Sequence, residues 1–179
     1  DWSSDVCSSD LAKRLDGRRY WRIPVMDGEF LCEDTVGQTK AVGGGNFLIL
    51  GRTRPAVLAA AERAIAEMRK VTGVIMPFPG GVVRSGSKVG SKYKGLVAST
   101  NDAYCPTLKG VAKSALPPTV DAVLEIVIDG LTDAVVGHAM VCGIRAACAG
   151  GGGEILRISA GNYGGKLGAF HYHLRKLLA

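Results

Sequence analysis

The chain has 179 residues, of which 47% are hydrophobic, and it carries a formal net charge of +6 at pH 7. Its apolar runs are shorter than a bilayer-spanning helix requires, so we expect no membrane segment. Its five cysteines include no CxxC pair and no metal-ligand spacing, a pattern typical of a reducing, cytoplasmic protein. The basic balance favours anionic partners such as nucleic acid or polyanionic small molecules.

The first eleven residues, DWSSDVCSSDL, resemble the in-frame translation of a sequencing adapter. The alternative is a genuine flexible amino-terminus. On the first interpretation, residues 1-11 are not native, and the rest is the carboxy-terminal part of a longer protein. Omitting the three aspartates of this segment raises the formal charge from +6 to +9.

Residues 12-42 are predicted to form a β-hairpin. The run RRYWRIPVMDGEFLCEDTVG (Arg18–Gly37) places two β-rich segments on either side of Asp27-Gly28. Asp-Gly is a strong signal for a two-residue hairpin turn. We therefore expect a hairpin that leads into a separate domain.

Residues 43-179 are predicted to form that domain. Its expected elements are a strand at Asn46–Gly51, a helix from Pro55, strands at Val74–Phe78 and Val120–Gly130, a helix from Thr132 to Cys148, and a strand at Ile155–Ser159. This order predicts an α+β, ferredoxin-like split βαβ fold, with an antiparallel sheet and two helices on one face. A long insertion, Pro79–Thr119, separates strands two and three. Such insertions are usually functional or disordered.

The front of the insertion is rich in glycine, hydroxyl groups and positive charge, in the run MPFPGGVVRSGSKVGSKYKG. Ser-Lys follows its spaced glycines where a P-loop requires Lys-Ser/Thr, and no helix is expected next, so we reject that motif. Backbone N–H groups and cations here could still bind carboxylate or phosphate groups. The alternative is a solvated surface loop. The candidate binding residues are Arg84, Ser85, Ser87, Lys88, Ser91 and Lys92.

Glu125 is the candidate catalytic residue. Alternation along Val120–Ile128 puts Val120, Ala122, Leu124, Ile126 and Ile128 on the helix side, and Glu125 on the uncovered face. A partly desolvated carboxylate has a raised pKa unless a cation or donor compensates. Arg157 is a possible partner. The alternatives are an acid–base group and a structural ion pair or rim charge.

Two further segments supply candidate binding residues. NDAYCP contributes Asn101, Asp102 and Tyr104, and the glycine-rich run GNYGGKLG contributes Asn162, Gly164, Gly165 and Lys166. Glycines permit close approach of backbone to a ligand, although a bulged turn would need them too. The three histidines have no acid or thiol spacing for a metal site, so we expect no metal.

Several of these runs together resemble the formylmethanofuran–tetrahydromethanopterin formyltransferase family: VIMPFPGGVVRSGSKVGSKYKG, ASTNDAYCPT, LEIVIDGL and ISAGNYGGKLGAFHYHL. The resemblance extends from about Leu15 to the end. It implies the carboxy-terminal, distal lobe, joined by the hairpin to a missing proximal lobe. It also implies formyl transfer between methanofuran and N5 of tetrahydromethanopterin, in methanogenesis or in formaldehyde oxidation.

The resemblance implies the mechanism and partners as well. The two coenzymes are carrier substrates, no cofactor is tightly bound, and Glu125 falls on the glutamate at the transfer centre. Direct attack by the pterin amine needs no covalent enzyme intermediate. Asn101 or backbone N–H groups would stabilise the oxyanion. The expected assembly is a homotetramer, with further subunits of a formyltransferase/hydrolase complex in bacteria.

Two rival interpretations remain. A basic ferredoxin-like sheet also occurs in RNA-recognition domains, which stack bases on aromatic residues of the central strands. Here those strands offer Phe47 and little else, and Asp121 and Asp129 would repel phosphate. The other rival is a non-catalytic scaffold subunit of the complex.

Overall fold

The computed structural model describes residues 11–84, 86, 88–95, 99–150, 152–161 and 168–179. They belong to two units, one ending at Lys40 and the other running from Ala41 to Ala179. The adapter-like stretch, apart from Leu11, lies outside the described residues.

The smaller unit is a three-stranded antiparallel sheet, whereas the sequence predicted a two-stranded hairpin. Its strands are β1 (Ala12–Leu15), β2 (Arg18–Val25) and β3 (Gly28–Glu33), in the order β1-β2-β3. The β2–β3 turn lies at Met26 and Asp27, because Val25 pairs with Gly28. The additional strand arises from a second Asp-Gly turn, in which Asp16 and Gly17 both have positive φ.

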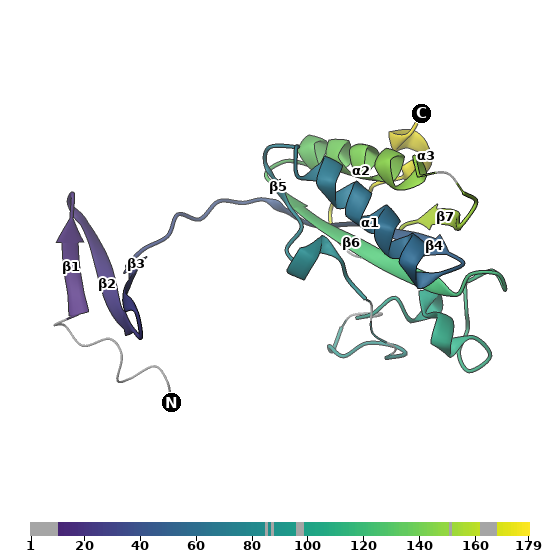
Figure 1. Cartoon of the computed structure of the whole chain (residues 1–179), viewed down its shortest axis with the longest axis horizontal. Helices are drawn as coiled ribbons and strands as arrows, with labels where there is room; N and C mark the ends of the chain where they lie inside the picture. The colour runs from purple at the N-terminus through teal and green to yellow at the C-terminus, as the bar shows by residue number, and fades with distance from the viewer. Residues whose placement is uncertain (1–10, 85, 87, 96–98, 151, 162–167) are drawn as a thin grey trace. The chain divides into compact units, whose positions relative to one another are not determined.

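The larger unit contains a four-stranded sheet in the order β5-β6-β4-β7, and every neighbouring pair is antiparallel. Helices α1 and α2 pack together and cover one face of this sheet (Figure 1). The elements are β4 (Val42–Gly51), α1 (Arg54–Met68), β5 (Val74–Ile75), β6 (Ala122–Gly130), α2 (Asp133–Cys148), β7 (Ile155–Ser159) and the short α3 (Leu174–Leu177).

The strand boundaries differ from the predicted ones at two places. β4 begins four residues before the predicted start and includes a bulge, where the register shifts between Val42 and Gly45. β5 keeps only two residues of the predicted Val74–Phe78 strand. Pro77 and Pro79 explain its early end, since proline cannot donate a ladder hydrogen bond.

Side-chain alternation divides the buried residues of the central strands between two clusters. Phe47 and Ile49 belong to the main core with the helices, whereas Leu48 and Leu50 belong to a second cluster on the other face. Val120 belongs to this second cluster and precedes β6, so its predicted position on the helix side was wrong.

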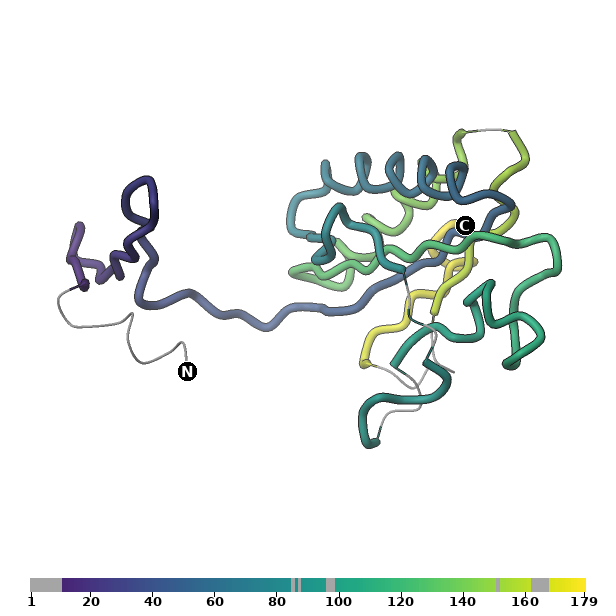
Figure 2. The backbone as a smooth tube through the Cα atoms, turned by 60° about the horizontal axis from the view of Figure 1, so that its bottom comes forward, coloured from purple at the N-terminus to yellow at the C-terminus, as the bar shows by residue number. Residues whose placement is uncertain are grey.

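The insertion lies on the face of the sheet opposite α1, as the teal and green tube of Figure 2 shows. Tyr104 and Leu116 from the insertion pack against Leu48, Leu50 and Val120. This face was predicted to be uncovered, and that prediction was wrong. The insertion gives the sheet a second, smaller hydrophobic layer, under which a polar group can be buried.

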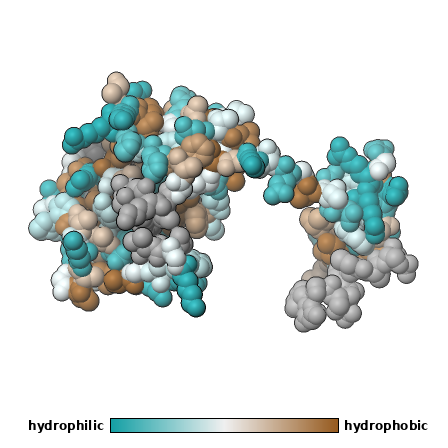
Figure 3. Space-filling view, turned by 180° about the vertical axis from the view of Figure 1, so that it is seen from behind, coloured by the Kyte–Doolittle hydropathy of each residue, from teal (hydrophilic) through white to brown (hydrophobic). Residues whose placement is uncertain are grey.

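The surface of the larger unit mixes hydrophobic and hydrophilic side chains in the view of Figure 3. No helix among the described residues is long and apolar enough to cross a membrane. The four cysteines that the structure describes are free thiols. Cys32 and Cys148 are exposed, and Cys105 and Cys142 are partly buried.

Candidate functional site

Glu125 is a buried carboxylate in the middle of β6, on the face covered by the insertion. Only 6% of the residue is exposed, less than sequence alternation alone indicated. The expected partner, Arg157, is exposed on β7, and Glu125 is in none of the ion pairs found among the described residues. The carboxylate is therefore stabilised by neutral hydrogen-bond donors.

Two side-chain amides act on the Glu125 carboxylate. Nδ2 of Asn46, on β4, donates to Oε1 of Glu125 over 2.6 Å. The amide of Asn101, from the insertion, acts on the same carboxylate and favours its ionised form. Asn101 was predicted as a site residue, whereas Asn46 was missed, because its strand was read only for its hydrophobic pattern.

Gly161, the first residue of the glycine-rich run GNYGGKLG, packs against this amide–carboxylate cluster. A Cβ on Gly161 would lie 2.6 Å from Oδ1 of Asn101 and 3.0 Å from Nδ2 of Asn46. Real Cβ atoms do not approach other heavy atoms as closely as 2.6 Å. A glycine is therefore needed here for close packing, and Gly161 joins Asn46, Asn101 and Glu125 in one cluster.

Burial raises the pKa of the Glu125 carboxyl above its ordinary value. The hydrogen bonds from Asn46 and Asn101 act in the opposite direction, because they favour the ionised form, but desolvation is the larger effect. A carboxyl with a raised pKa can carry a proton closer to neutral pH. This residue therefore has the properties of a general acid–base group.

The insertion is attached to the same strand through Val83. Val83 and Glu125 form an isolated antiparallel bridge, with both backbone N–H groups donating to the partner's carbonyl. Arg84, the next residue along, is exposed. The basic segment thus begins directly beside the buried carboxylate.

Further along, the hydroxyl groups of Ser91 and Thr100 bond to backbone atoms of the insertion itself. Ser91 Oγ donates to Tyr93 O over 2.9 Å, and Tyr93 N donates back to Ser91 Oγ over 3.0 Å. Thr100 Oγ1 donates to Lys88 O over 2.6 Å. The hydroxyl of Ser91, predicted to bind substrate, therefore stabilises a turn in this structure.

The predicted cationic and polar site residues are only partly brought together. Arg84, Lys88 and Lys92 are exposed, and Lys92 Nζ lies 6.0 Å from the centroid of the Tyr93 ring. Asp102 begins a short 3₁₀ turn, η3 (Asp102–Tyr104), directly after Asn101. The remaining predicted residues lie outside the described part of the chain: Ser85, Ser87, Asn162, Gly164, Gly165 and Lys166.

Tyr104 links η3 to the edge of the sheet. Its hydroxyl accepts a hydrogen bond from Ser159 Oγ over 3.3 Å, and Ser159 pairs with Leu48, which in turn pairs with Glu125. The tyrosine is half-buried between the insertion and β7. It therefore helps to fix the insertion over the sheet near Glu125.

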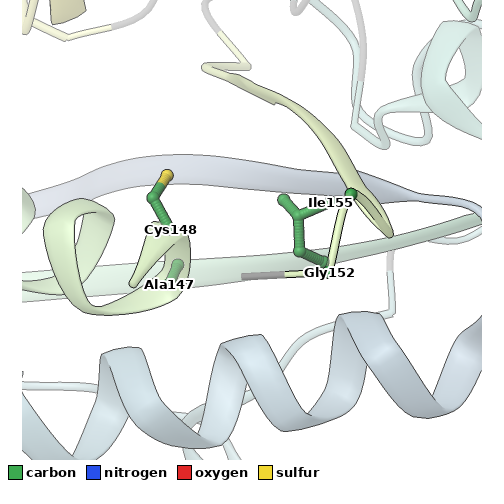
Figure 4. A pocket seen from close by; sticks show the side chains of 5 residues that line it. Ala147, Cys148, Gly152 and Ile155 are labelled. Carbon is green, nitrogen blue, oxygen red and sulfur yellow. The ribbon is translucent and has the colours of Figure 1, made fainter. Parts of the chain in front are cut away.

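A separate shallow pocket lies at the end of α2, beside the start of β7 (Figure 4). Its lining is Ala147, Cys148, Gly152, Gly153 and Ile155, with no charged side chain. Among the residues that the structure describes, no group of three or more histidine, cysteine or acidic side chains is arranged to hold a metal ion. The acid–base candidate of the larger unit therefore remains the Glu125 cluster.

Phe47, the aromatic residue that the nucleic-acid interpretation required on the open sheet face, lies on the opposite face. It is fully buried in the main core beneath the helices. A side chain in that position cannot stack on a base.

The chain matches a family model described as "FTR, proximal lobe" over residues 28–177. It is 65% identical over 170 residues to the formylmethanofuran–tetrahydromethanopterin formyltransferase of Methylococcus capsulatus, covering 94% of this chain and 57% of that protein. It is 54% identical over 164 residues to the corresponding enzyme of Methanopyrus kandleri, covering 91% and 54%.

Two solved structures are similar. The formyltransferase/hydrolase complex of Methylorubrum extorquens, solved with methylofuran, matches with a TM-score of 0.73 and 58% identity, over 94% of this chain and 57% of that chain. The formyltransferase of Methanosarcina barkeri matches with a TM-score of 0.71 and 42% identity, over 93% and 56%.

The chain spans a little more than half the length of the curated relatives it matches. The family model describes the matching part as the proximal lobe, so the expected assignment to the distal lobe is not confirmed. The match nevertheless covers most of the chain, from β3, the third strand of the smaller unit, to α3. The chain therefore belongs to the formylmethanofuran–tetrahydromethanopterin formyltransferase family.

Proposed function

We propose that this chain is part of an enzyme that transfers a formyl group between formylmethanofuran and N5 of tetrahydromethanopterin. Two of its relatives, 65% and 54% identical, are named formylmethanofuran–tetrahydromethanopterin formyltransferases. The observation that carries the proposal to this chain is Glu125, a carboxyl that is only 6% exposed and accepts a hydrogen bond from the amide of Asn46. Such a group, with a raised pKa, suits proton transfer during acyl exchange between two amines.

The reaction proceeds without a covalent enzyme intermediate. N5 of the pterin attacks the formyl carbon, a new C–N bond forms, and the carbonyl oxygen takes the negative charge. The oxyanion then returns its electron pair to re-form the carbonyl group while the C–N bond to methanofuran breaks, and the electron pair of that bond goes to the leaving nitrogen. Glu125 gives its proton to that nitrogen, and the proton lost from N5 restores the acid, so protons and electrons balance. General acid–base help of this kind contributes roughly 10²–10⁴-fold to the rate.

The exposed cations of the insertion suit anionic carrier substrates. Arg84, Lys88 and Lys92 are on the surface of the insertion, and Arg84 follows Val83, which forms the backbone bridge with Glu125. Charge of this sign attracts carboxylate and phosphate groups and raises the association rate. Both coenzymes would act as carrier substrates, with no tightly bound cofactor.

The larger unit is proposed to be a ferredoxin-like lobe. Its strand order β5-β6-β4-β7, its antiparallel pairing and the two helices on one face support this assignment. The smaller unit would connect it to another lobe of the complete protein. We further propose a cytoplasmic homotetramer, as the resemblance implies.

A specific observation favours a second candidate, a role within a larger complex. One relative, 58% identical over 175 residues, is named as one of the subunits of the formyltransferase/hydrolase complex of Methylorubrum extorquens. In such an assembly this chain would act catalytically or as a scaffold.

The test measures formyl transfer by pterin absorbance in the protein encoded by the complete gene, with Glu125→Gln beside the wild type. The amide keeps the shape of the side chain and can still accept from Asn46. We expect kcat to fall about a hundredfold. Glu62→Gln, an exposed position on α1, is the control. Equal activity of both variants and the wild type would reduce Glu125 to a structural role, and an inactive wild type would support the scaffold.

A further inference from the structure

We propose that Asn46 is a positioning residue of this site, which keeps Oε1 of Glu125 as a permanent acceptor, so that Oε2 is the oxygen that carries and transfers the proton. The inference rests on the proposed acid–base role of Glu125. It adds to that role a specific protonated oxygen and the residue that selects it.

The contact that carries the inference is the hydrogen bond from Asn46 Nδ2 to Glu125 Oε1, at 2.6 Å. Both side chains project from the same face of adjacent central strands, where Asn46 pairs with Val127 and Glu125 pairs with Leu48. Side chains on such rigid elements are held more precisely than side chains on loops. Gly161 packs against the amide at close range and leaves it little room to move.

The chemistry of the two groups then decides which oxygen is protonated. An amide NH₂ is only a donor, whereas a protonated carboxyl has one donor oxygen and one acceptor oxygen. If Oε1 carried the proton, two donors would face each other across the hydrogen bond with Asn46. The contact with Asn46 therefore excludes the proton of the neutral acid from Oε1 and leaves Oε2 as the oxygen that can carry it.

A glycine bulge in β4 sets the face to which Asn46 belongs. The register shifts between Val42 and Gly45, and Gly44 has φ +86°, a conformation that favours glycine. Asp129 Oδ1 accepts a hydrogen bond from Gly44 N over 2.9 Å and so anchors the bulge. The extra residue changes the alternation of β4, so that Val42 faces the helices and Asn46 faces Glu125.

The side-chain interactions of the Glu125 carboxyl are made with the amides and not with the other charged groups near this face. On β6 the next acidic residue of the same face is Asp129, which is bonded to the bulge, and on β7 the charged residue is the exposed Arg157. From the insertion, Arg84 is exposed, and Asp102 follows Asn101. Among the described residues, neither Arg84 nor Arg157 forms an ion pair with Glu125.

The experiment compares Asn46→Ala and Asn46→Asp with the wild type and Glu125→Gln, all in the complete protein. The pH profile of kcat is measured, and the carboxyl of Glu125 is titrated directly by NMR in protein labelled with ¹³C at the glutamate carboxyl carbons. Thermal unfolding reports whether each variant is folded. Glu62→Gln, an exposed position on α1, is the control, because it changes a side chain on the helix side of the sheet.

We expect Asn46→Ala to lower kcat about 10- to 100-fold, with KM nearly unchanged, because the proton donor is misplaced while substrate binding is not. The NMR pKa of Glu125 should rise further, since the alanine variant lacks a donor to the ionised form. In Asn46→Asp the introduced carboxyl can donate to Oε1 only when it is protonated. Its activity should therefore recover as pH falls and be lost as pH rises.

The two proposals fail in different ways. If Glu125→Gln is impaired while Asn46→Ala keeps the kcat, the pH profile and the NMR pKa of the wild type, the positioning role is overturned and the acid–base role stands. If Glu125→Gln is fully active, the acid–base role itself fails. If Asn46→Ala does not fold, the test uses Asn46→Asp instead. In that case, a ratio of Asn46→Asp activity to wild-type activity that stays constant with pH overturns the positioning role.

Discussion

Val83 and Glu125 exchange two backbone hydrogen bonds, from Val83 N to Glu125 O over 2.8 Å and from Glu125 N to Val83 O over 2.9 Å. A residue of the insertion therefore pairs with the residue that carries the buried carboxylate. The pairing prolongs the sheet beyond the two-residue strand β5. It also fixes the first part of the basic segment relative to the proposed acid–base group.

This bridge predicts the effect of removing one donor. Val83→Pro eliminates a backbone N–H and leaves the buried carbonyl of Glu125 without it. We expect the free energy of unfolding to fall by about 1–3 kcal/mol and KM for the carrier substrates to rise. Val83→Ala keeps both backbone bonds and is the control. Unfolding in urea and steady-state kinetics measure the two effects, and equal behaviour of the two variants would contradict the prediction.

The close packing at Gly161 predicts a large effect from a single methyl group. In Gly161→Ala the Cβ would lie 2.6 Å from Oδ1 of Asn101, so the amides must move away from the carboxylate. We expect kcat to fall about tenfold or more. Gly152→Ala is a useful comparison for crowding, since a Cβ there meets nothing within 4 Å, although its positive φ adds backbone strain. Wild-type kcat in folded Gly161→Ala would show that the amides do not need this geometry.

The raised pKa of Glu125 predicts how stability depends on pH. The folded state binds the proton more tightly than the unfolded state, so between the two pKa values the folded protein holds more protons. The free energy of unfolding of the wild type should therefore decrease as pH rises from about 4.3 through the folded pKa, by at most about 1.4 kcal/mol per pH unit from this group. Glu125→Gln removes this contribution.

The measurement is denaturant unfolding of the wild type and Glu125→Gln at a series of pH values. The difference in free energy of unfolding, wild type minus variant, should become more negative as pH rises and level off above the folded pKa. A difference that does not change with pH would mean that folding leaves the pKa of Glu125 unaltered. A difference that grows more positive with pH would mean that the carboxylate is stabilised on folding.

The exposed lysines of the insertion predict a salt-dependent effect on substrate binding. Reversing the charge of Lys88 and Lys92 to glutamate should raise KM for the anionic carriers by roughly threefold per lysine at low salt, with kcat little changed. The effect should shrink at high ionic strength, because salt screens exposed charges. Arg175→Glu with Lys176→Glu, on α3, changes the net charge equally. An equal rise in KM for both pairs would indicate an effect of net charge alone.

Sequence patterns predicted the regular elements well where the signals are local. Thr132 caps α2 and accepts from Val135 N over 3.3 Å, as its position before the periodic segment indicated. Alternation placed Glu125 on the face away from the helices. The Asp27-Gly28 signal found a hairpin, although the turn lies one residue earlier. Each of these features depends on residues within a few positions of each other.

The site itself depended on contacts between distant segments. Asn46 and Glu125 are 79 residues apart and meet only because β4 and β6 pair with a bulge that the sequence pattern did not reveal. Val83 and Gly161 reach the same place from two other segments, and neither has a side chain that signals chemistry. Their contribution is backbone pairing and close approach, which a reading of side-chain types does not detect.

The sequence by itself determined the helices and strands and the two faces of the central strands. It also identified Glu125 as a carboxylate on the face away from the helices. The tertiary structure decided that this face is covered, that Glu125 is buried, and that amides rather than Arg157 hold it. The physical reason is that periodicity and turn signals act over a few residues, whereas burial depends on which segment packs on a strand. The insertion packs on β6, and the desolvation that raises the pKa of Glu125 follows from that burial.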